Sequence, residues 1–301
     1  MRPRIALSAA GLAAVALLTL AATASAGPWG LSRGEWFASV EGSTFTANTY
    51  HLDDGSRVDL GSLIVESRAL ALSGEFGWKR HMTLAFRLPA MSVTERFGQF
   101  QATSTGFQNV GLGLRYNLKN AASALAVELD WEAPAGYNRR LSTLGDGLQT
   151  LTLNAAAGGG LMGRGFLQGS IGYAYRYLGI GKRDKGPVPA GETHTAKFTW
   201  ADRVVASADL GYWAGPSLLV GGRYRGSLTV ANGPFAAETD VHLVGPVLLY
   251  RVDDRIDMFA GSWTTAKGTN TLHYDQIYAG VSFHNTKLNR LQGFLGGKQS
   301  P

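Results

Sequence analysis

The chain has 301 residues, among them 40 glycines and no cysteine, and it carries a formal net charge of +6 at pH 7. Without cysteine, disulfides and thiolate metal sites are excluded, so backbone pairing and side-chain packing must hold the fold. The basic excess is spread along the chain rather than gathered into one patch, which argues against nucleic acid as a partner.

The N-terminus has the pattern of a secretory signal peptide. Two arginines precede an apolar run from Ile5 to Ala22, and the run leads to Ala24-Ser25-Ala26 before Gly27. A basic start, an apolar segment and an A-x-A ending are typical of a segment that is cleaved after export. We expect residues 1–26 to be removed, leaving a net charge of about +4. The alternative is an uncleaved membrane anchor, because the run is nearly long enough to span a bilayer.

Turn-forming residues divide the mature chain into about twelve segments of strand length. They are residues 35–51, 64–78, 82–96, 104–118, 122–133, 148–162, 165–180, 198–214, 217–231, 239–252, 256–266 and 273–283. No apolar run among them approaches the roughly 18 residues of a helical span, and frequent glycine disfavours long helices. If the chain spans a membrane, it must therefore do so as a closed barrel, which alone satisfies the backbone of strands in lipid.

The connections between these segments alternate in length along the chain. The short ones are Lys79–His81, Lys119–Ala121, Gly163–Arg164, Gly215–Pro216 and Asp253–Arg255. The longer ones begin near Leu52, Arg96, Ala133, Gly181, Ala231 and Lys267. Short periplasmic turns that alternate with longer outer loops are typical of an outer-membrane β-barrel.

The strand from Asn109 to Leu118 shows how the two faces differ. Alternation places Val110, Leu112 and Leu114 on one face, and Gly111, Gly113 and Arg115 on the other. An arginine that faced the middle of the bilayer would cost about 2–4 kcal/mol, so the apolar face is predicted to meet lipid. A secreted antiparallel sandwich or a lipocalin-like barrel remains the alternative, because alternation alone fits it equally well.

The same alternation in other segments predicts a charged lumen. The candidate pore-lining residues are Glu75, Arg115, Glu128, Asp130, Glu132, Arg176, Arg203, Asp209, Arg223 and Arg225. We interpret the three carboxylates from 128 to 132 as an acidic strip that faces a basic wall. Residues 239–252 and 256–266 do not show which of their faces is which.

The stretches GPWGLSRGEWFASVEGSTFTANTY from Gly27 and TGFQNVGLGLRYNL from Thr105 resemble a known family. They are similar to outer-membrane transporters loosely grouped with phenol meta-pathway channel proteins. Members open with a tryptophan, a Gly-Glu pair and a first strand, and later carry a G-x-x-D/N-x-x-x-G-x-x-Y strand. The resemblance covers the mature chain as a pattern and implies an outer-membrane barrel that passes small hydrophobic or aromatic molecules.

The end of the chain departs from that pattern. Residues 277–283, IYAGVSF, look like a last strand that ends on an aromatic residue, as outer-membrane assembly requires, yet further residues follow. We expect a barrel over residues 27–284 and a flexible periplasmic tail over residues 285–301. Turn-spaced apolar residues in the tail leave a plug or partner helix as the alternative.

Some residues of the sequence could also serve enzymatic chemistry. Same-face residues lie roughly 6.5–7 Å apart along a strand, so Glu128, Asp130 and Glu132 approach the carboxyl spacing of an inverting glycosidase. The six histidines fall in loops or near strand ends without a catalytic phrase. No Walker-type loop, paired metal-ligand motif or G-x-S-x-G is present. We expect no catalytic residue, no metal and no cofactor.

The sequence thus predicts a porin-like transporter in the outer membrane of a Gram-negative bacterium. Its expected partners are outer-membrane lipid and lipopolysaccharide, the outer-membrane assembly machinery and a small-molecule solute. The basic loop from Lys182 to Lys197 and the arginines at 139 and 140 could bind lipopolysaccharide phosphates or be merely solvated. An outer-membrane hydrolase and a structural or adhesive barrel without transport are the alternative functions.

Overall fold

A computed structural model describes residues 27–135, 148–177, 202–230 and 239–286. Fourteen strands occur in these ranges: β1 (Trp36–His51), β2 (Arg57–Asp59), β3 (Leu63–Lys79), β4 (Met82–Phe97), β5 (Phe100–Phe107), β6 (Asn109–Asn120), β7 (Ser123–Pro134), β8 (Gln149–Leu161), β9 (Gly165–Tyr177), β10 (Asp202–Trp213), β11 (Leu218–Val230), β12 (Asp240–Arg251), β13 (Ile256–Thr269) and β14 (Thr271–His284). No helix within the described ranges is long and apolar enough to cross a membrane.

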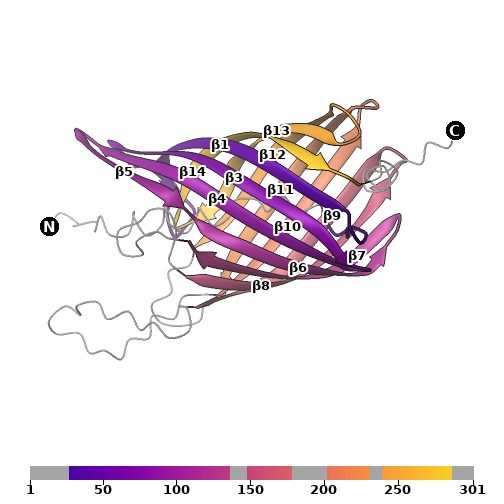
Figure 1. Ribbon diagram of the computed structural model, residues 1–301. Coiled ribbons are helices and arrows are strands. Elements are labelled where there is room, and N and C mark those ends of the chain that lie inside the picture. Colours follow the sequence, from indigo (N-terminus) through magenta and orange to yellow (C-terminus); the bar gives the residue numbers. More distant parts are fainter. Residues whose placement is uncertain (1–26, 136–147, 178–201, 231–238, 287–301) are drawn as a thin grey trace.

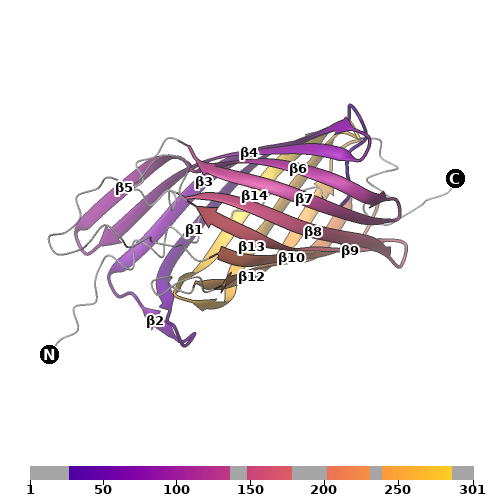
Figure 2. The same ribbon diagram turned by 90° about the horizontal axis from the view of Figure 1, so that it is seen from below.

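The strands form a closed antiparallel β-barrel (Figures 1 and 2). Each wall strand pairs with its neighbour along the chain, and β14 pairs with β1 from Phe37↔His284 to His51↔Thr271, which closes the sheet. Twelve of the fourteen described strands make the wall, because β2 pairs only with the end of β1 and β5 only with β4. The predicted all-β, twelve-stranded, transmembrane-type up-and-down architecture is confirmed.

The predicted segment 104–118 is interrupted, and the long connection expected after Arg96 is wrong. Residues 97–100 form a tight hairpin turn, and β5 runs back along β4 until Phe107 lies opposite Ala90. Gln108 then stands out of the pairing, donating its backbone N–H to Pro89 O at 2.9 Å, before β6 continues along β4. A residue inserted into one strand in this way is a bulge, and it lies opposite the proline that lacks a donor.

The tight turns lie at one end of the barrel, and β5 projects from the other (Figure 1). Positive φ angles at His81, Met162 and Gly163 make two of these turns compact. The long connection expected from Lys267 is instead extended strand, with only Asn270 between β13 and β14. Residues 136–147, 178–201 and 231–238, which include most of the loops predicted from Ala133, Gly181 and Ala231, lie outside the described residues, as do residues 1–26 and 287–301.

Large apolar side chains cover the outside of the barrel. Leu112 is 56% exposed, Leu153 57% and Ile171 61%, whereas the alternate residue Arg115 is 5% exposed. The structure also decides the two segments whose faces the sequence left open. Trp263 on β13 is 4% exposed and packs inside the barrel with Tyr278 and Leu243.

Candidate functional site

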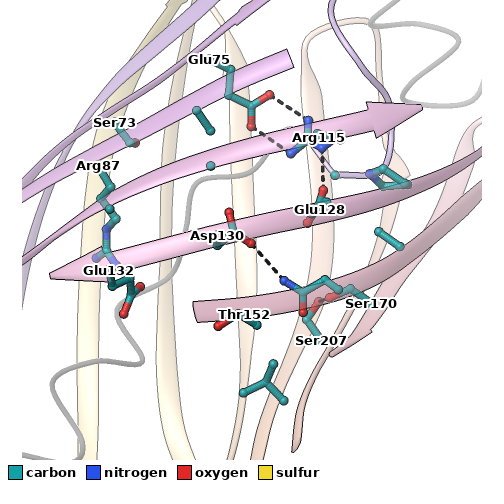
Figure 3. Close-up of a pocket in the computed structure, with 18 of the residues that line it drawn as sticks. Ser73, Glu75, Arg87, Arg115, Glu128, Asp130, Glu132, Thr152, Ser170 and Ser207 are labelled. Atoms are coloured by element: carbon teal, nitrogen blue, oxygen red, sulfur yellow. Dashed lines mark hydrogen bonds and ion pairs between the residues drawn. The ribbon is translucent and has the colours of Figure 1, made fainter. Parts of the chain in front are cut away.

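The barrel encloses a polar cavity of about 210 Å³ (Figure 3). Its lining comes from β3, β4 and β6 through β11, together with Gly27 and Pro28. Of the predicted pore-lining residues, the cavity wall includes Glu75, Arg115, Glu128, Asp130, Glu132, Asp209 and Arg225. Seven charged side chains from five strands therefore meet around one space.

The register of β6 and β7 builds the acidic side of the cavity. Arg115 lies opposite Glu128, Gly113 opposite Asp130, and Gly111 opposite Glu132. A Cβ at position 113 would lie 2.5 Å from Asp130 Oδ1, so glycine leaves the space that this carboxylate occupies. Glu128 therefore lies directly opposite a cation, whereas Asp130 and Glu132 lie opposite glycines.

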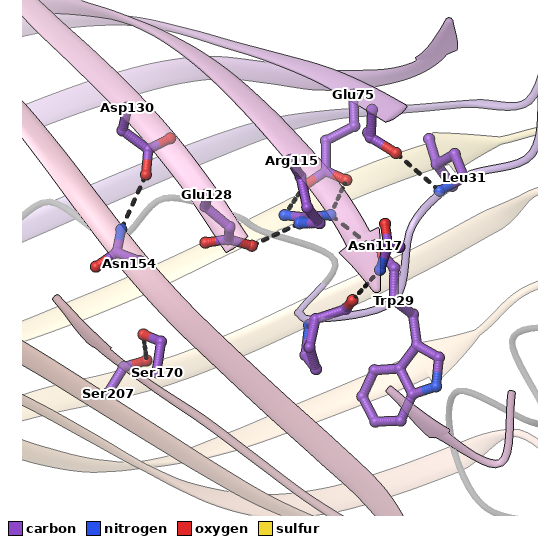
Figure 4. A network of polar contacts seen from close by, with 12 residues as sticks. Trp29, Leu31, Glu75, Arg115, Asn117, Glu128, Asp130, Asn154, Ser170 and Ser207 are labelled. Atoms are coloured by element: carbon purple, nitrogen blue, oxygen red, sulfur yellow. Dashed lines mark hydrogen bonds and ion pairs between the residues drawn. The ribbon is translucent and has the colours of Figure 1, made fainter. Parts of the chain in front are cut away.

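Arg115 joins two strands through ion pairs (Figures 3 and 4). Its Nη1 lies 2.9 Å from Glu75 Oε2, its Nη2 donates to Glu75 Oε1 at 3.2 Å, and its Nε lies 2.5 Å from Glu128 Oε1. Two parallel N–H···O bonds between guanidinium and carboxylate are strong and directional. Because Arg115 and Glu75 are both nearly inaccessible, this cluster fixes the shape of the lumen.

The other two carboxylates have different surroundings. Asn154 Nδ2 donates to Asp130 Oδ2 at 3.0 Å. Arg87 and Glu132 flank Gly111 on its two neighbouring strands, and Figure 3 shows both side chains at the cavity. Glu128 is held by Arg115 and Asp130 by an amide, which favours charge pairing over acid–base chemistry at this strip.

The basic side of the lumen is carried by β11. Arg223 Nε lies 3.1 Å from Asp209 Oδ1, and Arg223 Nη1 donates to Tyr278 Oη at 3.3 Å. The guanidinium carbons of Arg223 and Arg225 lie 5.2 and 5.6 Å from the centre of the Trp263 ring, a range in which cation–π attraction operates. Arg225 Nε is buried and has no hydrogen-bond partner within the described residues, and the Arg225 side chain lines the cavity.

Three predicted residues do not line the cavity: Arg223, which is bound to Asp209 and Tyr278, and the pair Arg176 and Arg203. Arg176 is near the last residue of β9 and Arg203 near the first residue of β10, both at the end opposite the tight turns. Each is buried, with 9% and 7% of its surface exposed, and neither lines the cavity. They form a separate basic level of the barrel.

An apolar cluster occupies another part of the barrel interior. It contains Ala47, Val65, Met91, Val93, Val241, Leu243, Trp263, Leu272, Tyr274 and Tyr278. These residues come from β1, β3, β4 and β12–β14. The Trp263 ring contacts both this cluster and the two arginines of β11, so the polar cavity borders an aromatic surface.

Sequence reasoning missed several residues of the site. Arg87, Asn154 and Gln168 line the cavity, and alternation could have identified Arg87, because Phe86 and Leu88 on either side of it face outward. The entry of Gly27 and Pro28 into the cavity has no periodic signal in the sequence. No group of three or more potential metal ligands occurs within the described ranges.

Searches for a matching protein-family model and for a matching curated protein sequence found none. Solved structures with a similar fold include an outer membrane channel from Pseudomonas putida F1, at 13% identity and a TM-score of 0.66 over 87% of this chain and 100% of that one. The NanC porin shares 10% identity, with a TM-score of 0.50 over 82% of this chain and 98% of that one.

The translocator domain of the autotransporter NalP from Neisseria meningitidis also matches, at 9% identity and a TM-score of 0.50, over 89% of this chain and 92% of that domain. At such identities the likeness shows the fold alone. The chain therefore has the fold of outer-membrane β-barrels, which is the fold that the resemblance of its sequence implied.

Proposed function

We propose that this protein is a passive channel for small solutes in the outer membrane of a Gram-negative bacterium. The observation that carries the proposal is a closed barrel with an apolar exterior and a cavity lined by charged side chains of both signs. Similarity to the fold of an outer membrane channel supports it. Solutes would move down their concentration gradients through a lumen narrowed by side chains.

The distribution of charge supports a membrane setting. The outward side chains of the central strands are leucine, isoleucine, valine and aromatic residues, whereas Arg115, Arg223 and Asp209 point inward into ion pairs. A cation placed at the middle of the lipid face would cost about 2–4 kcal/mol. The present arrangement avoids that cost and leaves the charges beside the lumen.

The neighbourhood of Trp263 supports a solute class. A small molecule with an anionic group and an apolar or aromatic body would find the Arg225 guanidinium at the cavity wall, with the Arg223 guanidinium and the Trp263 ring packed next to it. The guanidinium fork matches the geometry of a carboxylate. Aromatic acids are therefore the proposed solutes, ahead of neutral sugars.

Two kinds of partner belong to the same proposal, the lipids of the outer membrane and the machinery that assembles its proteins. Lipid would surround the apolar exterior, and the basic segment from Lys182 to Lys197 would face lipopolysaccharide. The assembly machinery would recognise the last strand, β14, which carries the outward-facing Phe283 near its end. Both assignments extend the proposed outer-membrane location.

Cysteine substitution at neighbouring residues tests the channel. Thr152 lines the cavity, whereas Leu153 next to it is 57% exposed on the outer surface. In planar bilayers, a charged water-soluble thiol reagent should reduce the ionic current of Thr152→Cys and leave that of Leu153→Cys unchanged. Equal responses of the two variants, or no current in either, would contradict the proposed function.

A further inference from the structure

The segment Gly27–Leu31, which precedes the first strand, lies inside the barrel at the tight-turn end. Trp29 is 6% exposed and Leu31 is 8% exposed, and Pro28 is among the most deeply buried side chains of the described residues. Figure 4 shows Trp29 and Leu31 beside the Arg115 cluster. The residues that follow the expected cleavage site are therefore part of the lumen.

Side chains of β4 and β6 hold the backbone of this segment. Asn117 Nδ2 donates to Pro28 O at 2.5 Å, and Arg115 Nη1 donates to Trp29 O at 3.2 Å. Thr83 Oγ1 accepts a hydrogen bond of 3.0 Å from the backbone N–H of Leu31. If the segment withdrew, Asn117 Nδ2 and Thr83 Oγ1 would lose these partners, and leaving buried polar groups unpaired is unfavourable.

The segment continues from β6 toward β8 and β9. Trp29 Nε1 donates to Ala121 O at 3.0 Å, and a Cβ at Gly158 on β8 would lie 2.6 Å from the Trp29 ring. A Cβ at Gly27 would lie 2.0 Å from Gln168 Oε1 on β9. The segment therefore crosses the lumen from β4 to β9.

Gln168 has an incomplete set of hydrogen bonds at this contact. Its Nε2 donates to Asp209 Oδ2 at 2.8 Å, but its buried Oε1 has no partner within the described residues. Gly27 lies next to this oxygen, since a Cβ built there would be 2.0 Å from it, and Gly27 itself lines the cavity. Cleavage after Ala26 would turn the Gly27 nitrogen into an α-ammonium group, which has three donor hydrogens and an ordinary pKa of about 7.7–8.0.

Residues 27–31 thus line the lumen, and we propose that the α-ammonium of Gly27 is a selectivity-determining cation there. This inference rests on the proposed channel function and on removal of residues 1–26. The ammonium donates to Gln168 Oε1 and, through the Gln168 amide, is linked to Asp209. Removal of the signal peptide thus adds a positive charge to a cavity that is lined by five carboxylates and three guanidinium groups.

The position of the segment can be tested without any measurement of transport. A Cβ at position 30 would lie 2.7 Å from Asn117 Cγ, so Gly30→Cys with Asn117→Cys should form a disulfide in the folded protein. Leu118 is the next residue and faces outward, 58% exposed, so Gly30→Cys with Leu118→Cys should not. Intact-mass and non-reducing gel analysis of the heat-modifiable, folded fraction decides between them. A free thiol pair in the first variant would overturn the placement.

Truncation gives a second test of the path. A mature chain that lacks residues 27–31 should assemble, because these residues contribute no strand to the wall, and it should show a severalfold larger single-channel conductance. Unchanged conductance in the folded truncated protein would overturn the placement of this segment in the path.

The ammonium is tested by converting the N-terminal glycine to a glyoxylyl group through transamination, which removes the α-amine and leaves lysine side chains intact. The reaction is carried out on unfolded mature protein, which is then refolded beside a mock-treated control. Intact mass should first show that the mature chain begins at Gly27, and another starting residue would overturn the proposal. The modified channel should shift its reversal potential toward cation preference, and an unchanged potential would overturn the role of the ammonium. If mock-treated protein does not conduct at all, the proposed function fails, while the disulfide result still decides where the segment lies.

Discussion

Arg115 on β6 and Glu128 on β7 occupy directly opposed positions, with Arg115 Nε 2.5 Å from Glu128 Oε1. The same guanidinium binds Glu75 on β3 and the carbonyl oxygen of Trp29. One side chain thus connects the acidic strip, a second wall strand and the segment that crosses the lumen. Its removal is expected to affect both stability and permeation.

Replacing Arg115 with methionine should lower the free energy of unfolding by about 3–5 kcal/mol, because two carboxylates lose their buried partner. Equilibrium unfolding by urea in detergent micelles measures the change. Arg96→Met is the matched control, since the Arg96–Glu66 pair is 3.2 Å long but has side chains that are 47% and 36% exposed. Exposed pairs contribute about 0–1 kcal/mol, so similar losses in the two variants would contradict the role given to Arg115.

Replacing Leu112 with arginine should impair assembly, because it places a cation on the lipid face at a cost of about 2–4 kcal/mol. Gly111→Ser, at the adjacent inward position, should assemble, because a Cβ there would lie 3.6 Å from Arg87 Cβ and 3.9 Å from Glu132 Cγ, in ordinary contact. Heat-modifiable mobility of outer-membrane fractions measures assembly. Normal assembly of both variants would show that Leu112 does not meet lipid.

The strand from Asn109 to Leu118 shows what alternation could predict. Leu112 is exposed and Arg115 is buried, as alternation predicts. The polar face of this strand is the inner one, because the lumen contains charged groups. Alternation failed at β13, where Phe259 and Trp263 are inward and pack on Tyr278. The lumen there is filled by aromatic side chains, so apolar residues occur on both faces of the strand and the period-two contrast is lost.

Contacts between distant segments account for the rest of the site. The contact between Arg115 and Glu128 could be predicted, because β6 and β7 are adjacent in the chain. The ion pair between Arg115 and Glu75 reaches across β4 to β3, and no pattern in either strand indicates it. The course of Gly27–Leu31 through the lumen depends on single hydrogen bonds, one donated by Asn117 and one accepted by Thr83. Such contacts have no periodic signature in the sequence.

The orientation of the barrel can be tested with single cysteines in this cysteine-free chain. Phe100, at the β4–β5 turn, is 81% exposed, and Met162, in the β8–β9 turn at the opposite end, is 100% exposed. Because tight turns face the periplasm in outer-membrane barrels, an impermeant maleimide should label Phe100→Cys on intact cells and Met162→Cys only after lysis. The reverse pattern would invert the proposed topology.

The two charged sides of the cavity should have opposite effects on ion selectivity. Charges in a confined lumen bias which ions enter. Neutralising Asp130 and Glu132 to asparagine and glutamine should therefore move the reversal potential toward anion preference. Neutralising Arg223 and Arg225 to glutamine should move it toward cation preference. Unchanged selectivity in both conducting variants would mean that these residues do not line the path.

Liposome swelling tests the central claim most directly, because it measures passage of the solute itself. Proteoliposomes of the mature protein should swell in isotonic solutions of small aromatic acids faster than in solutions of sugars of similar mass, and Arg225→Gln should reduce that difference. Swelling no faster than that of protein-free liposomes, for every solute in the panel, would contradict the account of this barrel as a channel.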